Sequence, residues 1–234
     1  MRASGFTIAE LTFVSSLIGI VVAIAVPKVI ASRVGSNESE AVETLKKLVE
    51  AQARVKSSCL IDADGNGVGE YGSFKELSGT SGIRKDTNGD GITDGPGESR
   101  ISPPVLEESF GELDERGMLV HSGYVFRLFL PDKVLRWQGE AALEKGGIHS
   151  ASAEKYWACY AWPVSSGFSG KRVFFVNQEG IILTCTNEKN HYSGMSSAPR
   201  YRAALSRQGL RKGMNSSIAV DATGRLGDHW SRVQ

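Results

Sequence analysis

The feature that most constrains this chain is an uncharged run from Leu11 to Val26, close to the N-terminus. Glu10 stands directly before the run and Pro27 directly after it. A helix from Phe6 to Ala31 would be ~39 Å long at ~1.5 Å per residue, enough to cross a hydrocarbon core of ~30 Å. The run therefore predicts a membrane-spanning helix. The carboxylate at its head needs an explanation, because an intramembrane acid is costly.

Three interpretations of this segment compete. A cleaved secretory signal peptide would explain Arg2 and the apolar run, but Glu10 would fall in its positive region and the apolar region would be long. An ordinary membrane anchor explains the length and leaves Glu10 unexplained. The third interpretation starts from the residues around the first glycine.

The stretch GFTIAE contains Gly5, Phe6 and Glu10, and it is followed by the apolar run and Pro27. This pattern resembles the class III leader and N-terminal helix of type IV pilins and type II secretion pseudopilins. The resemblance implies that prepilin peptidase cuts after Gly5, that Phe6 becomes the methylated N-terminus and that Pro27 softens the helix. It also implies that Glu10 pairs with the Phe6 amine of a neighbouring subunit, so that each charge relieves the cost of burying the other.

On this resemblance we expect a structural subunit of an extracytoplasmic helical filament, either a type IV pilin or a type II secretion pseudopilin. Its partners would be copies of itself, related pilin-like subunits, prepilin peptidase and, before assembly, the inner membrane. The assembled filament would lie in the periplasm or at the cell surface. The alternative is a monomeric calcium-binding envelope protein, anchored by an N-terminal membrane helix.

The segment that follows the apolar run is dense in Glu and Lys, with apolar residues at three- and four-residue steps. This spacing predicts an amphipathic helix. The face expected to be buried consists of Ala41, Val42, Leu45, Leu48, Val49, Gln52 and Val55, and the polar face of Glu38, Glu40, Glu43, Lys46, Lys47 and Lys56. Asn37 or Ser39 could cap a new helix, so a break near Gly35 is an alternative to one continuous helix.

Two stretches rich in Asp and Gly lie within the loop region 61–104. Their oxygen-bearing side chains are Asp62, Asp64, Asn66 and Glu70 in the first, and Asp86, Asn88, Asp90 and Asp94 in the second. Such side chains at alternate positions, followed by glycine, favour a hard cation such as calcium. Ser73 and Gly97 replace the bidentate Glu of an EF-hand, so we expect a looser calcium site that draws on both stretches. The alternative is that these residues simply form turns.

The resemblance also bears on this expectation, because major pseudopilins of type II secretion use calcium in their globular region. It gives no ligand positions for the present chain.

Segments between 105 and 186 predict a small antiparallel sheet. The predicted strands lie in SGYVFRLFLPD from Ser122, in EKYWACYAWPV ending at Pro163, and in KRVFFVNQEGIILTCT, which turns at Asn177 to Gly180. An aromatic cluster is expected to pack against the amphipathic helix rather than to form a carbohydrate platform: Tyr156, Trp157, Tyr160, Trp162, Phe174 and Phe175. The expected fold class is α+β and pilin-like, with a long N-terminal helix packed on this sheet.

The remaining expectations concern the ends, the cysteines and the chemistry. We divide the chain into a leader (1–5), a membrane or filament-core helix (6–31), an amphipathic helix (32–60), the loop region (61–104), the sheet (105–186) and a basic loop with a final hairpin (187–234). The tail is either a flexible surface loop or a basic patch for a partner subunit or an anionic surface. A net charge of +1 argues against nucleic acid.

Cys59, Cys159 and Cys185 leave the disulfide pairing open. The sequence has no HExxH motif and no nucleophile elbow, so we do not expect an enzyme.

Overall fold

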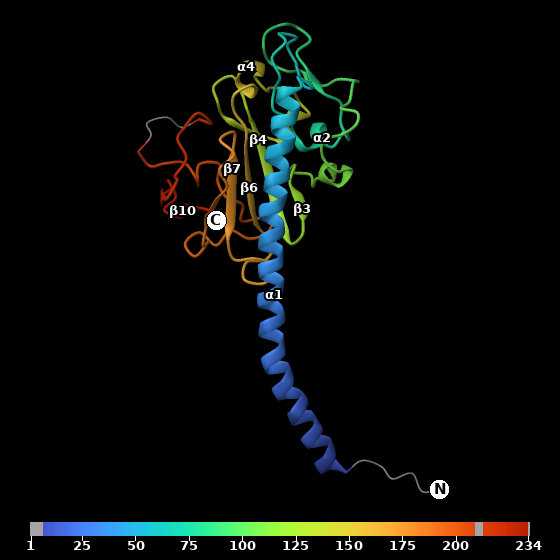
Figure 1. Ribbon diagram of the computed structural model, residues 1–234, viewed down its shortest axis with the longest axis vertical. Helices are drawn as coiled ribbons and strands as arrows, with labels where there is room; N and C mark the ends of the chain where they lie inside the picture. The colour runs from blue at the N-terminus through green and yellow to red at the C-terminus, as the bar shows by residue number, and fades with distance from the viewer. Residues whose placement is uncertain (1–6, 209–212, 234) are drawn as a thin grey trace, which may run out of the picture.

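The computed structural model describes residues 7–208 and 213–233, and it shows an α+β head carried on a long helical stalk (Figure 1). Helix α1 (Ile8–Ser57) is one uninterrupted helix of 50 residues, so it is ~75 Å long. The part of α1 from Ile8 to Arg33 projects from the head and is called the stalk below. The rest of α1 lies against the sheet. The expected α+β class, with a long N-terminal helix on an antiparallel sheet, is therefore confirmed.

The second half of α1 buries one face, as its spacing predicts. Ala41, Leu45 and Leu48 are buried in the core, whereas Val42 and Val49 are only partly buried. The break considered at Gly35 is absent, because α1 runs through that glycine. Glu38, expected on the polar face, is instead buried, because an ion pair and backbone N–H groups compensate its charge.

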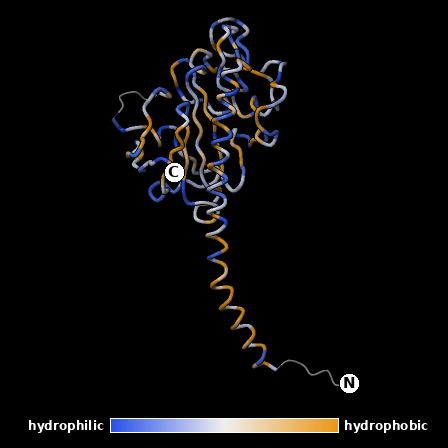
Figure 2. Tube along the Cα trace, viewed as in Figure 1, coloured by the Kyte–Doolittle hydropathy of each residue, from blue (hydrophilic) through white to orange (hydrophobic). Residues whose placement is uncertain are grey.

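The first half of α1 is mostly hydrophobic (Figure 2), and its large apolar side chains are exposed. None of its most apolar window is buried within the described chain, and α1 is long and apolar enough to cross a membrane. The stalk therefore has the length and composition of a membrane anchor or a signal sequence.

Within the described residues, eight antiparallel strands form the main sheet, in the order β3-β4-β6-β7-β8-β10-β9, with β5 also paired to β4. Their bounds are β3 (Leu119–His121), β4 (Tyr124–Pro131), β5 (Trp137–Gly139), β6 (Ala158–Pro163), β7 (Val173–Asn177), β8 (Leu183–Cys185), β9 (Ala222–Thr223) and β10 (His229–Arg232). The predicted strands correspond to β4, β6, β7 and β8. Gly180, in the turn before β8, has a φ of 71° that suits glycine.

The sheet is covered on both faces, which the sequence analysis did not predict. Trp157 and Phe174 face α1 as expected. Tyr160, Trp162 and Phe175 lie in a second core on the opposite face, so the expectation that the whole aromatic cluster packs against the helix is wrong. The second core is closed by the C-terminal tail, whose buried side chains include Tyr192, Ala203, Leu205, Met214 and Trp230. Alternate side chains of a strand point to opposite faces of the sheet, which is why neighbouring residues of β6 lie in different cores.

Short elements surround the far end of α1. They are α2 (Phe74–Leu77), β1 (Arg84–Lys85), β2 (Gly95–Pro96), the 3-10 helix η1 (Glu108–Gly111), α3 (Glu140–Leu143) and α4 (Ser150–Ala153). Strands β1 and β2 pair with each other and not with the main sheet. Figure 1 shows the loops of this region beyond the C-terminal end of α1.

Candidate functional site

The first candidate site is the N-terminal end of the stalk. Thr7 and Glu10 form a capping box: the Thr7 N–H donates to Glu10 Oε2 at 2.8 Å, and the Glu10 N–H donates to Thr7 Oγ1 at 3.2 Å. This reciprocal pairing satisfies free N–H groups at the helix start. Gly5 and Phe6, predicted as the processing junction, lie outside the described residues.

Pro27 lies inside the stalk without ending the helix. It has no N–H to offer to the carbonyl four residues earlier, so the helix loses one internal hydrogen bond there. Figure 1 shows the lower part of α1 curving away from the straight axis of its upper part. Loss of that bond is a recognised cause of such bending.

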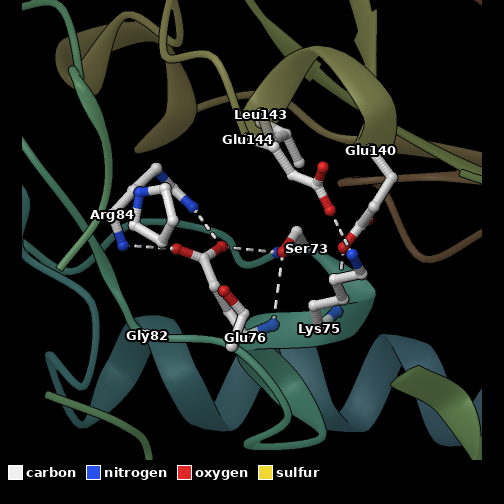
Figure 3. Close-up of a pocket in the computed structure, with 10 residues that line it drawn as sticks. Ser73, Lys75, Glu76, Gly82, Arg84, Glu140, Leu143 and Glu144 are labelled. Atoms are coloured by element: carbon white, nitrogen blue, oxygen red, sulfur yellow. Dashed lines mark hydrogen bonds and ion pairs between the residues drawn. The ribbon is translucent and has the colours of Figure 1, made fainter. Parts of the chain in front are cut away.

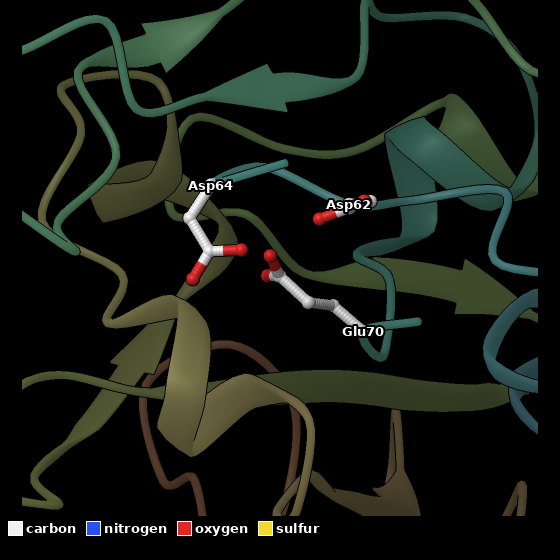
Figure 4. A group of neighbouring side chains, drawn as sticks. All are labelled: Asp62, Asp64 and Glu70. Carbon is white, nitrogen blue, oxygen red and sulfur yellow. The ribbon is translucent and has the colours of Figure 1, made fainter. Parts of the chain in front are cut away.

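The second candidate site is the first acidic stretch, at the far end of the head. One oxygen each of Asp62, Asp64 and Glu70 lies within 4.8 Å of the others (Figure 4). Asp62 also receives the N–H groups of Asn66 and Gly67, each at 3.0 Å. The structure therefore brings together three of the four oxygen-bearing side chains predicted in the first stretch.

Glu70 is not a free ligand, however. It is buried, and its two oxygens accept from the Ala63 N–H and from Arg84 Nη2, each at 2.8 Å. A cation at Glu70 would have to compete with this guanidinium. The first stretch therefore fits calcium poorly at Glu70, although neither Asp62 nor Asp64 forms a salt bridge with any residue that the structure describes.

The second acidic stretch repeats the backbone of the first. The φ angles are 70° and 81° at Gly65 and Gly67, and 76° and 77° at Gly89 and Gly91, in the same places of the two repeats. Glycine adopts this left-handed region more readily than any residue that carries a Cβ. Asp86 accepts the Gly91 N–H at 2.7 Å, just as Asp62 accepts that of Gly67.

Backbone N–H groups, and no Lys or Arg side chain of the described residues, contact the oxygen-bearing side chains of the second stretch. Asn88 accepts the Asp90 N–H at 2.9 Å, and Asp94 accepts the Thr87 N–H at 2.8 Å. Hydrogen bonds from Thr87 hold the pKa of Asp94 below its usual value. None of Asp86, Asp90 and Asp94 forms a salt bridge within the described residues, so this donor set fits a hard cation better than the first.

The two stretches lie side by side, because the Asp86 N–H donates to the Ala63 carbonyl at 3.0 Å. In the part of the chain that the structure describes, the acidic groups of the second stretch do not join the cluster of Asp62, Asp64 and Glu70. The expected single site built from both stretches is therefore not formed in this conformation. Two neighbouring loops of like geometry are present instead.

A buried charge network lies beneath these loops (Figure 3). Arg84 contacts Glu70 at 2.8 Å and Glu76 at 2.5 Å. Burial opposes the charge of Arg84, but the two carboxylates outweigh it and raise the pKa of the guanidinium. Glu140 accepts the N–H groups of Phe74 and Lys75 at the start of α2. Burial raises the pKa of Glu140 to about 7, although these hydrogen bonds oppose the rise.

This network is structural in character, because it ties α2, β1 and α3 together beneath the loops. Sequence reasoning missed it, although a signal was present. Ser73 and Glu76 form a capping box three residues apart, as do Thr7 and Glu10. The spacing of Ser or Thr to Glu predicts that motif. Nothing in the local sequence indicates that Arg84 would reach the same carboxylate.

The fold and the stalk define a class of protein: an α+β head on an N-terminal helix that is long and apolar enough to cross a membrane. The chain belongs to the DUF2950 family, described as proteins of unknown function, whose family model matches residues 22–193. That range includes part of the stalk and most of the head, and it excludes the pattern of Gly5, Phe6 and Glu10. No curated protein and no solved structure matches the chain.

Proposed function

We propose that the protein is a structural, non-enzymatic subunit of an extracytoplasmic helical filament, of the type IV pilin or type II secretion pseudopilin kind. Prepilin peptidase would remove residues 1–5, and the stalk would hold the subunit in the inner membrane until assembly. The observation that carries the proposal is the division of α1 into an exposed apolar half and a half that is integral to the head.

The exposed half of α1 requires a covering. Phe13, Leu17 and Ile20 are 72%, 54% and 60% exposed, respectively, and a continuous apolar surface of this kind is unfavourable in water. Lipid covers it before assembly, and the stalks of other copies cover it afterwards. Gly19 and Ala23 are small enough for neighbouring helices to approach closely.

In this proposal, Glu10 fixes the position of each subunit relative to its neighbour along the filament axis. Both hydrogen bonds that it accepts from the side chain and backbone of Thr7 go to Oε2. We expect Oε1 to face the Phe6 amine of an adjacent copy in the filament. An acid and an amine that pair in an apolar bundle each avoid the cost of burial alone.

The mass of the intact protein from membranes tests the processing step. Loss of Met1 to Gly5 together with a gain of one methyl group supports the proposal. A chain that keeps these residues, or loses a longer signal peptide, contradicts it. Electron microscopy of the polymer then tests the architecture, since the stalks must form the filament axis.

Glu10→Gln tests the register, with Glu98→Gln as the matched control. Glu98 is exposed on the head, and its substitution by glutamine removes the same charge. We expect the Glu10 variant to reach the membrane folded and to form few or no filaments, while the control assembles normally. Normal filaments from Glu10→Gln would rule out the register argument.

A second candidate function is that of a monomeric, membrane-anchored protein that binds calcium, and the repeated loop geometry at 62–70 and 86–94 favours calcium as a ligand. In our proposal the second stretch is the principal site, and Asp86, Asn88, Asp90 and Asp94 would hold the cation. Calcium would supply the charge that keeps these oxygens together. Calcium binding by processed, polymerised protein is compatible with the filament; binding by an unprocessed monomer favours the alternative.

A further inference from the structure

The loop between β6 and β7, residues 164–172, carries the most exposed large apolar side chain of the described head. Phe168 is 64% exposed, and Val164 in the same loop is 39% exposed. Figure 1 shows this loop at the lower end of the head, beside α1 where the stalk emerges. A large exposed aromatic side chain on a loop beside a membrane-length helix is a candidate membrane contact.

The loop is held in place rather than hanging free. Asn37 Nδ2 on α1 donates to the Ser169 carbonyl at 2.8 Å. The Glu38 carboxylate accepts the N–H groups of Lys171 and Arg172 at 2.9 and 3.1 Å. The segment that directly follows Phe168 is therefore fixed to the helix that forms the stalk.

Along the axis of α1, the loop lies close to the surface of a bilayer that the stalk would cross. Val29 is the last of the strongly exposed large apolar residues of α1, and Asn37 follows it by ~12 Å of helical rise. The interfacial layer of a bilayer adds ~5–8 Å on each side of the hydrocarbon core. The loop anchored at Asn37 therefore lies just above this layer, within reach of a phenylalanine side chain directed along the stalk toward the membrane.

Basic side chains are spread between the apolar run and the loop. Lys28 and Arg33 are exposed on α1 between the apolar run and the head, and Lys171 is exposed on the loop. The neighbouring acid Glu38 is already paired with Arg172 at 2.7 Å. An aromatic side chain beside exposed cations is the composition that favours an anionic lipid surface.

We propose that the 164–172 loop is a membrane seat: Phe168 enters the headgroup layer of an anionic bilayer, and Lys28, Arg33 and Lys171 lie against lipid phosphates. The seat holds the head upright on the membrane before assembly. It rests on the membrane stage of the proposed function and extends it from the stalk to the head.

The test places an environment-sensitive fluorophore on the loop of the full chain in vesicles of phosphatidylcholine and phosphatidylglycerol. Phe168→Cys is labelled in a Cys59→Ser background, since Cys59 is the exposed thiol. Val134→Cys is the matched control, because Val134 is 62% exposed and follows β4, ~23 Å along that strand from its end near Asn37.

We expect the label at 168 to show blue-shifted emission, strong quenching by lipids spin-labelled near the headgroup, and several-fold weaker quenching by aqueous iodide than the label at 134. Equal iodide quenching at the two positions overturns the seat. Protection at 168 that disappears when the protein is diluted in lipid also overturns it, because a second copy is then the cover. Flotation of the vesicles separates the two proposals: a chain that does not float with lipid refutes the membrane stage itself, whereas one that floats with position 168 in water refutes only the seat.

Discussion

Arg172 Nε lies 2.7 Å from Glu38 Oε2, which joins the strand-forming part of the head to the point where α1 enters it. Glu38 is largely buried, and its other oxygen accepts two backbone N–H groups from the same loop. One carboxylate therefore fixes the loop before β7 to the helix, more than a hundred residues away in the sequence.

We expect Glu38→Gln to lower the free energy of unfolding by about 1–3 kcal/mol, because charge-assisted hydrogen bonds to a poorly solvated carboxylate are lost. Urea unfolding of the detergent-solubilised chain measures this. Glu43→Gln is the control: its partner Lys46 is 3.8 Å away and both are exposed, so we expect no more than about 0.5 kcal/mol. Equal effects would show that Glu38 does not hold the loop.

The pH dependence of stability should report on Glu140. Its pKa is raised to about 7 in the folded chain from an ordinary value of 4.5, so the folded state binds more protons between these values. The free energy of unfolding therefore falls as pH rises from about 4.5 to 7, by up to about 3 kcal/mol, and then levels off. Comparison of pH 5 with pH 8 should show this fall in the native chain and not in Glu140→Gln. A variant with an unchanged pH profile would exclude Glu140 as its source.

Calcium should raise the melting temperature if the second acidic stretch binds it. At a calcium concentration a hundred times the dissociation constant, binding adds about 2.7 kcal/mol. Asp90→Asn should abolish most of this increase, and Asp64→Asn should affect it less, because the first stretch is partly neutralised by Arg84. A melting temperature that changes with neither calcium nor chelator would rule out calcium binding at the second acidic stretch.

The cysteines should differ sharply in reactivity. Cys159 and Cys185 are buried, and burial raises the pKa of both thiols, to about 12 for Cys185. They lie in the cores on opposite faces of the sheet, on β6 and β8 with β7 between them, so the pairing of these two that the sequence left open is excluded. Mass spectrometry after brief alkylation should find a single modified residue, Cys59. Rapid modification of either buried thiol would contradict the assignment.

Two glycines should respond oppositely to alanine. A Cβ on Gly170 would lie 2.2 Å from the Tyr124 hydroxyl oxygen, whereas one on Gly35 meets nothing within 4 Å. We expect Gly170→Ala to destabilise the head by about 1–3 kcal/mol through overpacking, and Gly35→Ala to stabilise α1 by up to about 1 kcal/mol. Thermal unfolding of the two variants decides both; a destabilised Gly35→Ala would indicate that the helix is strained there.

The sequence predicted those elements whose pattern is local. The apolar run and the three- and four-residue spacing together predict α1, and alternation with turn residues predicts β4, β6, β7 and β8. The break near Gly35 did not form, since a glycine costs a helix only about 1 kcal/mol and the packing of Ala41 and Leu45 supplies more than this.

What could not be predicted depends on partners that are distant in the chain. Glu38 looks like a surface residue in a helical pattern, and it is buried only because the loop at Arg172 covers it. The aromatic residues of β6 were assigned to one face because nothing local shows that the tail covers the other. The two acidic stretches have the predicted turns, but Arg84 decides that Glu70 is already neutralised.

Continuity of α1 through Gly35 has a mechanical consequence. Because α1 has no break at Gly35, a rotation of its straight part above Pro27 about the helix axis turns the whole head by the same angle. The side of the head that faces outward therefore depends on which contacts, with lipid or with other chains, fix the rotation of α1 about its axis. A small twist of α1 above Pro27 would accordingly change the direction in which the acidic loops face, since they lie beyond the far end of the same helix.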